Sequence, residues 1–155
     1  YSLDRLAFVG ERPIRYGGWY PDRKVRLFPK DKARWVGDFV HERLELDADL
    51  AIERLPGRLL HYSFRDLHDL IERSNRYSTL AAQGIVAQGK PLPPGKRWLS
   101  PAWRFIKFYF LKQGFRDGFL GGAVAWISCW EAWCRYTKVK EVRIHVRTQP
   151  TRSSG

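Results

Sequence analysis

Residues 58–83, RLLHYSFRDLHDLIERSNRYSTLAAQ, contain a change of hydrophobic period that decides the fold class. The first five, RLLHY, follow Pro56-Gly57 and have the composition of a short strand. After them, side chains recur at helical spacing (Leu67, Leu70, Ile71, Ser74, Tyr77 and Leu80 or Ala81). Ser63, with Asp66 three residues later, predicts a capping box, so we expect a helix over about residues 64–83. The stretch therefore predicts a fold that contains both sheet and helix.

The chain before this stretch predicts short strands and one aromatic loop. Residues 5–10 (RLAFVG), 24–28 (KVRLF) and 43–47 (RLELD) have the pattern of strands. Between the first two, the prolines and glycines of RPIRYGGWYPD indicate a loop. Its arginine and aromatic side chains, Trp19 among them, suit contact with a ligand.

Two helices, over residues 102–112 and 118–139, are predicted after GKPLPPGKRW, a linker by its prolines and glycines. The apolar run of the second helix has 12 residues before Glu131. A spanning helix needs about 20, so we expect no transmembrane span. Tryptophans between lysines and arginines predict helices that lie at a membrane surface (Trp103, Trp126, Trp130 and Trp133). The alternative is a helical pair packed on the rest of the domain.

The length of the chain indicates its number of domains, and its charge indicates the kind of partner it could bind. With 155 residues, 44% of them hydrophobic, the chain is expected to form one domain with a modest core. The net charge of +12 is uneven, because residues 96–155 contain 12 Lys and Arg against 3 Asp and Glu. This excess favours an anionic partner: phospholipid, the phosphates of a nucleotide, or nucleic acid. The chain begins at Tyr1 and contains no Met, from which we expect a part of a longer protein.

The motif GDFVHERLEL, residues 37–46, is the main catalytic candidate. A carboxylate at the end of a loop or strand acts as a general base if the fold places it near an acceptor hydroxyl. Glu42 is the first candidate for this role and Asp38 the second. The alternative is a polar turn in which His41 is a structural neighbour and Glu42 pairs with an arginine. Spacing alone favours the polar turn.

Two further residues are candidates for contact with a metal or a phosphate. The imidazole of His61, at a strand end, could serve either purpose, although a lone histidine is more often structural. Arg26 either faces a diphosphate, whose oxygens suit its planar guanidinium, or lies in solvent. The Asp47 and Asp49 pair follows a short strand rather than the long apolar strand that usually presents such a motif. The sequence contains no HxxxH, no CxxC, no glycine-rich phosphate loop and no GxSxG nucleophile motif.

Five motifs in order resemble the C-terminal half of bacterial family 2 glycosyltransferases, and most closely the lipopolysaccharide-core β-glucosyltransferases. The motifs are GGWYPDRKVRLF, GDFVHERLEL, LLHYSF, NRYSTLAA and PAWRFIKFYFLKQGFRDGFLGG, and the resemblance extends from about residue 5 to residue 140. It implies an α/β fold of the GT-A (nucleotide-diphosphosugar transferase) type, followed by amphipathic C-terminal helices. The half that holds the donor contacts and the Asp-x-Asp metal motif is expected upstream of this chain.

The resemblance also implies roles in catalysis. Glu42 corresponds to the base of an inverting transfer, with Asp38 behind it, and would take the proton of an acceptor hydroxyl as its oxygen attacks the anomeric carbon. A divalent metal, Mg²⁺ or Mn²⁺, would stabilise the departing nucleoside diphosphate, with its main ligands in the upstream half. His61 matches a position that would complete the metal site or the diphosphate site.

Substrate contacts are expected from four other residues. Arg26 and Trp19 would line the sugar or acceptor side, with Arg26 facing the diphosphate. His41 is a further candidate for substrate contact. Arg76 belongs to an Asn-Arg-Tyr motif whose role stays open between packing and substrate contact.

The resemblance predicts four regions and a location. Residues 1–88 would be the acceptor-side part of the catalytic domain, 89–98 the linker, 99–147 the membrane-associated helices and 148–155 a disordered tail. The expected partners are a nucleotide sugar, a lipid-linked saccharide and the anionic cytoplasmic face of the bacterial inner membrane, bound peripherally, and no nucleic acid. The alternative is a non-catalytic module that binds a membrane surface or an anionic polymer. Nucleic-acid binding, suggested by a pI near 10.1, is a weaker alternative.

Overall fold

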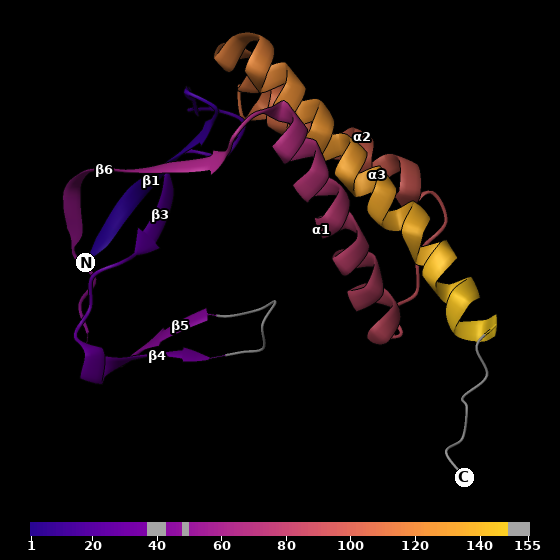
Figure 1. The fold of residues 1–155 in the computed structure, drawn as a ribbon, viewed down its shortest axis with the longest axis horizontal. Coiled ribbons are helices and arrows are strands. Elements are labelled where there is room, and N and C mark those ends of the chain that lie inside the picture. The colour runs from indigo at the N-terminus through magenta and orange to yellow at the C-terminus, as the bar shows by residue number, and fades with distance from the viewer. Residues whose placement is uncertain (37–42, 48–49, 149–155) are drawn as a thin grey trace.

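The protein folds into a four-stranded sheet, a separate two-stranded hairpin and a layer of three helices (Figure 1). The structure is a computed structural model. It describes residues 1–36, 43–47 and 50–148, with side chains up to residue 145. No helix in these ranges is both long and apolar enough to cross a membrane, which agrees with the length of the apolar run in the sequence.

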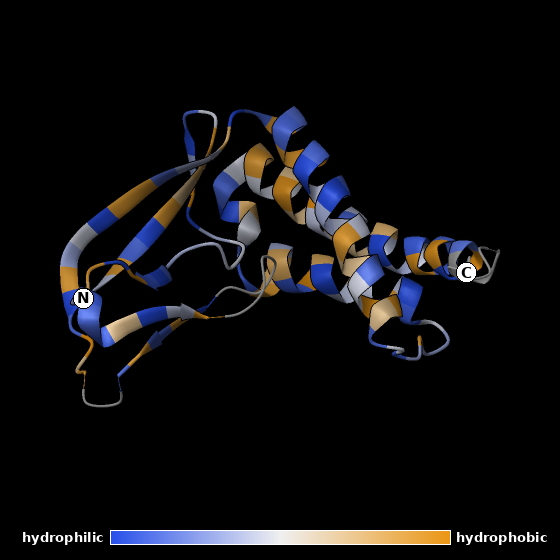
Figure 2. Cartoon of the chain, turned by 60° about the horizontal axis from the view of Figure 1, so that its bottom comes forward, coloured by the Kyte–Doolittle hydropathy of each residue, from blue (hydrophilic) through white to orange (hydrophobic). Residues whose placement is uncertain are grey.

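The first strand organises the main sheet, because β1 (Ser2–Val9) pairs with the three other strands. It runs antiparallel to β2 (Arg12–Ile14) and β3 (Asp22–Val25), and parallel to β6 (Arg54–Phe64). Burial alternates along most of β1, as expected for a strand with one face toward a core, whereas most of β6 is exposed. Hydrophobic and hydrophilic residues are mixed along the long strands (Figure 2).

The hairpin consists of β4 (Ala33–Val36) and β5 (Arg43–Leu46), which pair antiparallel. A short 3₁₀ turn, η1 (Lys30–Lys32), leads into it. Within the hairpin, Glu45 accepts hydrogen bonds from the guanidinium groups of Arg34 and Arg43, at 3.3 and 3.0 Å. These side chains are exposed, so the two ion pairs are expected to contribute little to the free energy of folding. In the chain, β4 and β5 flank residues 37–42, which carry the predicted base.

The helical layer is built around the last helix. Both α1 (Leu67–Ala87) and α2 (Lys96–Ile106) pack against α3 (Gly118–Thr148), as Figure 1 shows. Helix α2 continues into a π-helical turn, η2 (Lys107–Leu111), and a 3₁₀ turn, η3 (Gly114–Asp117), precedes α3. Lys138 ties α3 to α1, because its ammonium group lies 2.6–3.0 Å from oxygens of Asn75, Ser78 and Thr79. Asn75 of the Asn-Arg-Tyr motif is thus engaged in helix packing.

The sheet and the helices meet in one apolar core. Its buried members are Val9 and Ile14 from the sheet, and Leu70, Leu120, Val124 and Ile127 from the helices. Trp19, Phe64 and Leu67 pack against it and are partly buried. Burial of each such side chain contributes about 1.5–3 kcal/mol, so this junction fixes the helical layer against the sheet.

The structure corrects the expected start of the first helix. Strand β6 continues to Phe64, which pairs with Val9, and the Ser63 hydroxyl bonds the His61 carbonyl. Ser63 is therefore still in the strand, and the predicted capping box is wrong. Asp66 is the N-cap instead, and its carboxylate accepts a hydrogen bond from the Asp69 amide at 2.8 Å. The helix runs from Leu67 to Ala87.

Each of the four predicted strands corresponds to a strand of the structure, but β2 and β4 were not predicted. Strand β6 begins at Arg54 rather than after Pro56-Gly57, because its register against β1 shifts there and the two residues fit into the irregularity. Arg12–Ile14, expected as loop, forms β2 at the sheet edge, where Pro13 needs no amide partner. Strand β4 was also missed, and β3 ends at Val25, short of the predicted residue 28.

The closing helices are longer than predicted. Helix α2 begins at Lys96, inside the expected linker, and accommodates Pro101. Helix α3 extends to Thr148, so the first residue of the expected tail is helical; residues 149–155 lie outside the described ranges. Helix α3 has buried residues along its length, from Leu120 to Val139, because it packs between α1 and α2. The packed alternative thus describes much of α3, but exposed aromatic rings lie on both helices, Trp98 and Trp103 on α2 and Phe119 and Trp126 on α3.

Candidate functional site

Basic side chains gather on one face of the main sheet. Neighbouring residues in paired strands point to the same face. Arg5 lies opposite Asp22 in β3 and two positions from Ala7, the partner of His61 in β6, so Arg5, Asp22 and His61 share a face. Arg26 follows β3 directly. We call Arg5, Lys24, Arg26 and His61, with Arg73 of α1, the cationic face.

One carboxylate lies within the cationic face. Asp22 accepts hydrogen bonds from the Arg5 guanidinium, one of them from Nε at 2.8 Å, and lies 3.2 Å from the Lys24 ammonium. The Arg5 and Asp22 side chains are 27% and 29% exposed, so the pair is at the surface but partly shielded. Arg73 is paired in turn with Asp69 of α1, at 2.9 Å. The two carboxylates stand against four cationic side chains, so the face keeps an excess of positive charge and suits an anion.

The pKa of His61 reports the local charge. Partial desolvation and the guanidinium groups of Arg5 and Arg26 lower its pKa below 6.5, against a smaller opposite effect of Asp22. Because the pKa is lower in the folded chain, the stabilisation linked to His61 is present above pH 6.5 and is lost as the pH falls through the lowered value. At neutral pH the imidazole is uncharged and can accept or donate a hydrogen bond.

Binding of a diphosphate at the cationic face should raise the pKa of His61. An anion between Arg5 and Arg26 offsets the positive charges that disfavour the imidazolium. Two-dimensional NMR of the imidazole C–H groups would follow the titration with and without inorganic pyrophosphate, and His68 on α1 would report any general effect of the added salt. An unchanged His61 titration at saturating pyrophosphate would exclude a diphosphate at this face.

Trp19 lies beside the cationic face. Its ring packs edge-on against Phe64 with centroids 5.9 Å apart, and the Arg73 guanidinium lies over the same Phe64 ring at 5.5 Å. A cavity of about 310 Å³ is lined by Trp19, Asp22 and Phe108 together with nearby glycines. Because Asp22 lines this cavity and also bonds Arg5 of the cationic face, the cavity adjoins that face. An aromatic wall beside cations suits a sugar joined to a phosphate.

The loop that carries Trp19 is fastened to the helical layer. One carboxylate oxygen of Asp117 accepts hydrogen bonds from the amides of Arg15 and Tyr16, at 3.0 and 2.8 Å. The Gly17 amide donates to the Lys112 carbonyl at 2.9 Å, and the Arg116 guanidinium lies 4.5 Å from the centre of the Tyr16 ring. The segment 112–117 therefore holds the loop in position.

Asp117→Ala should loosen the Trp19 loop. Two amides lose a charged acceptor, and hydrogen bonds to charged groups contribute about 1.5–3 kcal/mol each when buried. Since the Arg15 bond is exposed, we expect a loss of about 1–2 kcal/mol in the free energy of unfolding. Urea denaturation measures it, and Asp117→Asn, which keeps an acceptor oxygen, should lose less. Equal losses for the two variants would contradict the role of these bonds.

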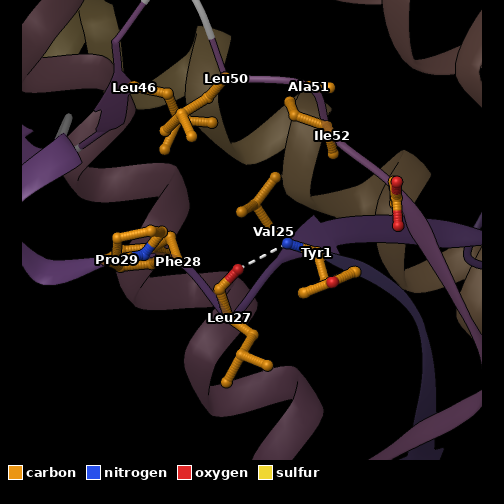
Figure 3. A pocket seen from close by; sticks show the side chains of 10 residues that line it. Tyr1, Val25, Leu27, Phe28, Pro29, Leu46, Leu50, Ala51 and Ile52 are labelled. Atoms are coloured by element: carbon orange, nitrogen blue, oxygen red, sulfur yellow. Dashed lines mark hydrogen bonds between the residues drawn. The ribbon is translucent and has the colours of Figure 1, made fainter.

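A second cavity does not fit the same ligand. It has a volume of about 370 Å³ and lies between the end of β3, the hairpin and residues 50–53 (Figure 3). Its lining is mostly aliphatic and aromatic, and the Tyr1 amino group donates to the Leu27 carbonyl at 2.6 Å within it. Glu53 is its one charged side chain, and its sign is wrong for a diphosphate. We place the site at the cationic face for this reason.

The predicted site residues divide into three groups. The structure brings Arg26, His61 and Trp19 into one region. Arg76 is exposed on α1 and lines a third cavity, of about 370 Å³, with Arg73, Asp69 and Glu72; through Arg73 this cavity borders the cationic face. The remaining candidates, in the motif of the predicted base, lie outside the described residues (Asp38, His41 and Glu42).

The donor atoms that the structure describes do not form a metal centre by themselves. Within the described residues, no group of three or more His, Cys, Asp or Glu side chains could hold a metal ion. Desolvation lowers the pKa of His61, the predicted ligand, most, and the nearby arginines lower it further; their positive charge opposes a divalent cation. Of the two roles expected for His61, contact with a diphosphate agrees better with these surroundings.

Comparison with known proteins gives the site a context. The chain is similar to curated bacterial glycosyltransferases. It is 27% identical over 165 residues to an uncharacterized glycosyltransferase of Rickettsia typhi, a match that covers 95% of this chain and 56% of the relative. It is 31% identical over 120 residues to the lipopolysaccharide core biosynthesis glycosyltransferase LpsC of Rhizobium meliloti, covering 73% of this chain and 44% of LpsC.

A similar glycosyltransferase of Rickettsia prowazekii is 26% identical over 162 residues, or 93% of this chain and 54% of that protein. The chain thus spans about half the length of the curated relatives it matches. No protein-family profile and no solved structure matches it significantly. The resemblance to glycosyltransferases drawn from the five motifs is confirmed at this level, whereas the GT-A fold and membership of family 2 stay predictions.

Five residues of the site were not singled out by the sequence: Arg5, Asp22, Lys24, Arg73 and Asp117. Arg5 and Asp22 meet through the register of β1 and β3, and Asp117 reaches a loop about 100 positions away. A signal existed for Arg5, since it is one of two charged residues in a strand that also contributes apolar side chains to the core. Nothing in the local sequence indicates the partner of Asp117.

Proposed function

We propose that this chain is the acceptor-side part of an inverting glycosyltransferase. The enzyme would move a hexose, such as glucose, from a nucleotide sugar to a lipid-linked core oligosaccharide or a similar glycan. The observation that carries the proposal is the similarity to curated glycosyltransferases, among them one named for lipopolysaccharide core biosynthesis. The cationic face beside the Trp19 cavity supports it, because a nucleotide sugar presents a diphosphate and a sugar ring together.

The proposed reaction is a single displacement at the anomeric carbon. Glu42 takes the proton of the acceptor hydroxyl, the hydroxyl oxygen attacks, and the bond to the nucleoside diphosphate breaks with inversion. Arg5 and Arg26 stabilise the negative charge that develops on the diphosphate, and neutral His61 adds a hydrogen bond. A divalent metal held by the donor-binding half is expected from the family resemblance.

The exposed side of α2 and the following turn supports attachment to a membrane. Large apolar side chains there are 44–71% exposed (Leu99, Trp103, Ile106, Phe110 and Leu111). Residues 96–116 include six basic and no acidic side chains. Aromatic rings at headgroup depth with cations beside them suit the anionic cytoplasmic leaflet, so we propose peripheral binding at the inner face of the bacterial inner membrane.

The experiment that tests the proposal is a transfer assay. A protein of the relatives' full length that carries these residues would be incubated with labelled nucleotide sugars and a lipid-linked core saccharide, and the labelled lipid product measured. Product formation with inversion at the anomeric carbon, read by NMR, supports the proposal. No transfer from any hexose donor would contradict it.

The second candidate is a non-catalytic module that binds a membrane surface or an anionic polymer. The six basic residues of the segment 96–116 favour it. Its expected result is vesicle binding without transfer. Salt-sensitive binding to DNA or RNA, with equal binding to neutral and anionic vesicles, would instead indicate a nucleic-acid partner.

A further inference from the structure

An open groove lies between α2 and α3. Its volume is about 480 Å³, and its nine lining residues comprise four tryptophans, one Phe, one Ile, one Pro, one Ala and one Cys. The rings of Phe105 on α2 and Trp126 on α3 face each other edge-on across 6.1 Å, and those of Trp98 and Trp133 lie 6.4 Å apart. No lining side chain is charged, so the groove suits an apolar ligand. We call it the α2–α3 groove.

The groove is unoccupied by any segment of the described chain, and its walls stay exposed. Trp98 and Trp126 are 60% and 65% exposed. A contiguous surface of this kind marks an interaction site in a soluble domain. The ring contacts continue from Trp126 through Phe105 to Phe110 and Tyr109, so the groove opens onto the apolar surface proposed to meet a membrane.

Charge around the groove identifies the occupant. Lys96 and Arg97 precede Trp98 directly, and the Arg97 guanidinium lies 5.0 Å from the centre of the Trp98 ring. Arg104, by contrast, is engaged with Glu131 at 3.2 Å. An apolar trough with two cations at one end complements a molecule that has an acyl chain and an anionic headgroup, rather than a second copy of this basic chain.

We propose that the α2–α3 groove binds one acyl chain of an anionic phospholipid, with its phosphate at Lys96 and Arg97. The proposal rests on the membrane attachment proposed above and makes it specific: one lipid leaves the bilayer plane to fill the groove, while the surrounding rings rest at headgroup depth. A single acyl chain contributes only weak membrane binding by itself, so the groove adds to the surface contact rather than replacing it.

The test uses a single-chain lipid, myristoyl lysophosphatidylglycerol, below its micellar concentration. Calorimetry should show one bound molecule per chain, and Ala102→Phe, which fills the groove from α2, should weaken this binding at least tenfold. Phe119→Ser is the matched control, because Phe119 is 80% exposed and does not line the groove; it should bind the lysolipid like the wild type. Lysophosphatidylcholine, which has no net charge, should bind less tightly than the anionic lipid.

Two cysteines provide an independent measurement. Cys129 lines the groove, whereas Cys134 is buried elsewhere in α3. The lysolipid should slow alkylation of Cys129 by a maleimide in the wild type and leave the Ala102→Phe rate unchanged. Circular dichroism and urea denaturation would establish that the variant is folded.

The outcomes separate this inference from the proposed function. Equal lysolipid binding by the wild type and Ala102→Phe, or no protection of Cys129, would overturn the groove proposal even where anionic vesicles are bound and sugar is transferred. If the wild-type protein binds neither anionic vesicles nor the lysolipid, the proposed membrane attachment is overturned as well. If sedimentation shows that the wild type is a dimer and that Ala102→Phe is a monomer, the groove binds a second copy of the chain. This result would also contradict the proposal.

Discussion

Glu42→Gln is expected to slow sugar transfer by about two to four orders of magnitude, the usual contribution of a general base. Glutamine keeps the size of the side chain and its hydrogen-bonding oxygen, but its amide does not take up a proton at neutral pH. The acceptor hydroxyl would then have to attack without losing its proton to the protein. The rate is measured as initial velocity of transfer, with a protein of the relatives' full length.

Asp38→Asn is the matched comparison for Glu42→Gln. Both substitutions remove one negative charge from the same motif, so a difference between them reports the specific role of the base. We expect the smaller loss for Asp38→Asn, and urea denaturation should show that both variants remain folded. The reverse order would assign the base to Asp38, and two fully active variants would favour the non-catalytic module.

Gly121→Ala is expected to cause the largest loss of stability. A methyl group at Gly121 would overlap the carbonyl oxygen of Gly114 and lie 2.9 Å from its carbonyl carbon. Gly114 itself approaches the Phe108 carbonyl, where a Cβ would lie 2.7 Å from the oxygen. Since these neighbours are backbone atoms, the start of α3 would have to move. We expect a loss of about 3 kcal/mol or more in the free energy of unfolding, at the upper end for an overpacked site.

The control for Gly121→Ala is Gly84→Ala in α1. A Cβ at Gly84 meets no atom within 4 Å, and alanine is the better helix former, so this variant should gain about 0.5–1 kcal/mol. Urea denaturation compares the two. A Gly121→Ala protein as stable as the wild type would show that α3 can separate from the turn at 114–117 at little cost.

The helices could be predicted well because their signal is local. The apolar spacing in residues 64–83 indicated α1, and the separation of the closing helices near Gly114 and Asp117 agrees with η3. The errors lie where contacts with residues distant in the sequence determine the secondary structure. Ser63 remains in β6 because β1 extends far enough to pair with Phe64, and Arg12–Ile14 is a strand only because β1 lies beside it.

Part of the site was predictable from the sequence, because some of its residues can be recognised by the chemical groups they carry. Arg26, His61 and Trp19 were selected for the groups they carry, and the structure places them in one region. The cationic face as a whole depends on strand register, which brings Arg5 and Asp22 together across 17 positions. The identity of the proposed base depends on the resemblance to glycosyltransferases, because the spacing of GDFVHERLEL alone favoured a polar turn.

The attachment of the Trp19 loop to residues 112–117 has a mechanical consequence. The apolar surface of α2 continues into the turn that bonds this loop. A displacement of Phe110 or Leu111 would therefore reach the wall of the Trp19 cavity through the hydrogen bonds that Lys112 and Asp117 accept from the loop. Docking on a bilayer would therefore set the height of that cavity above the lipid. Only acceptors whose sugars rise to that height would be aligned, so the same contacts would act as a ruler for glycan length.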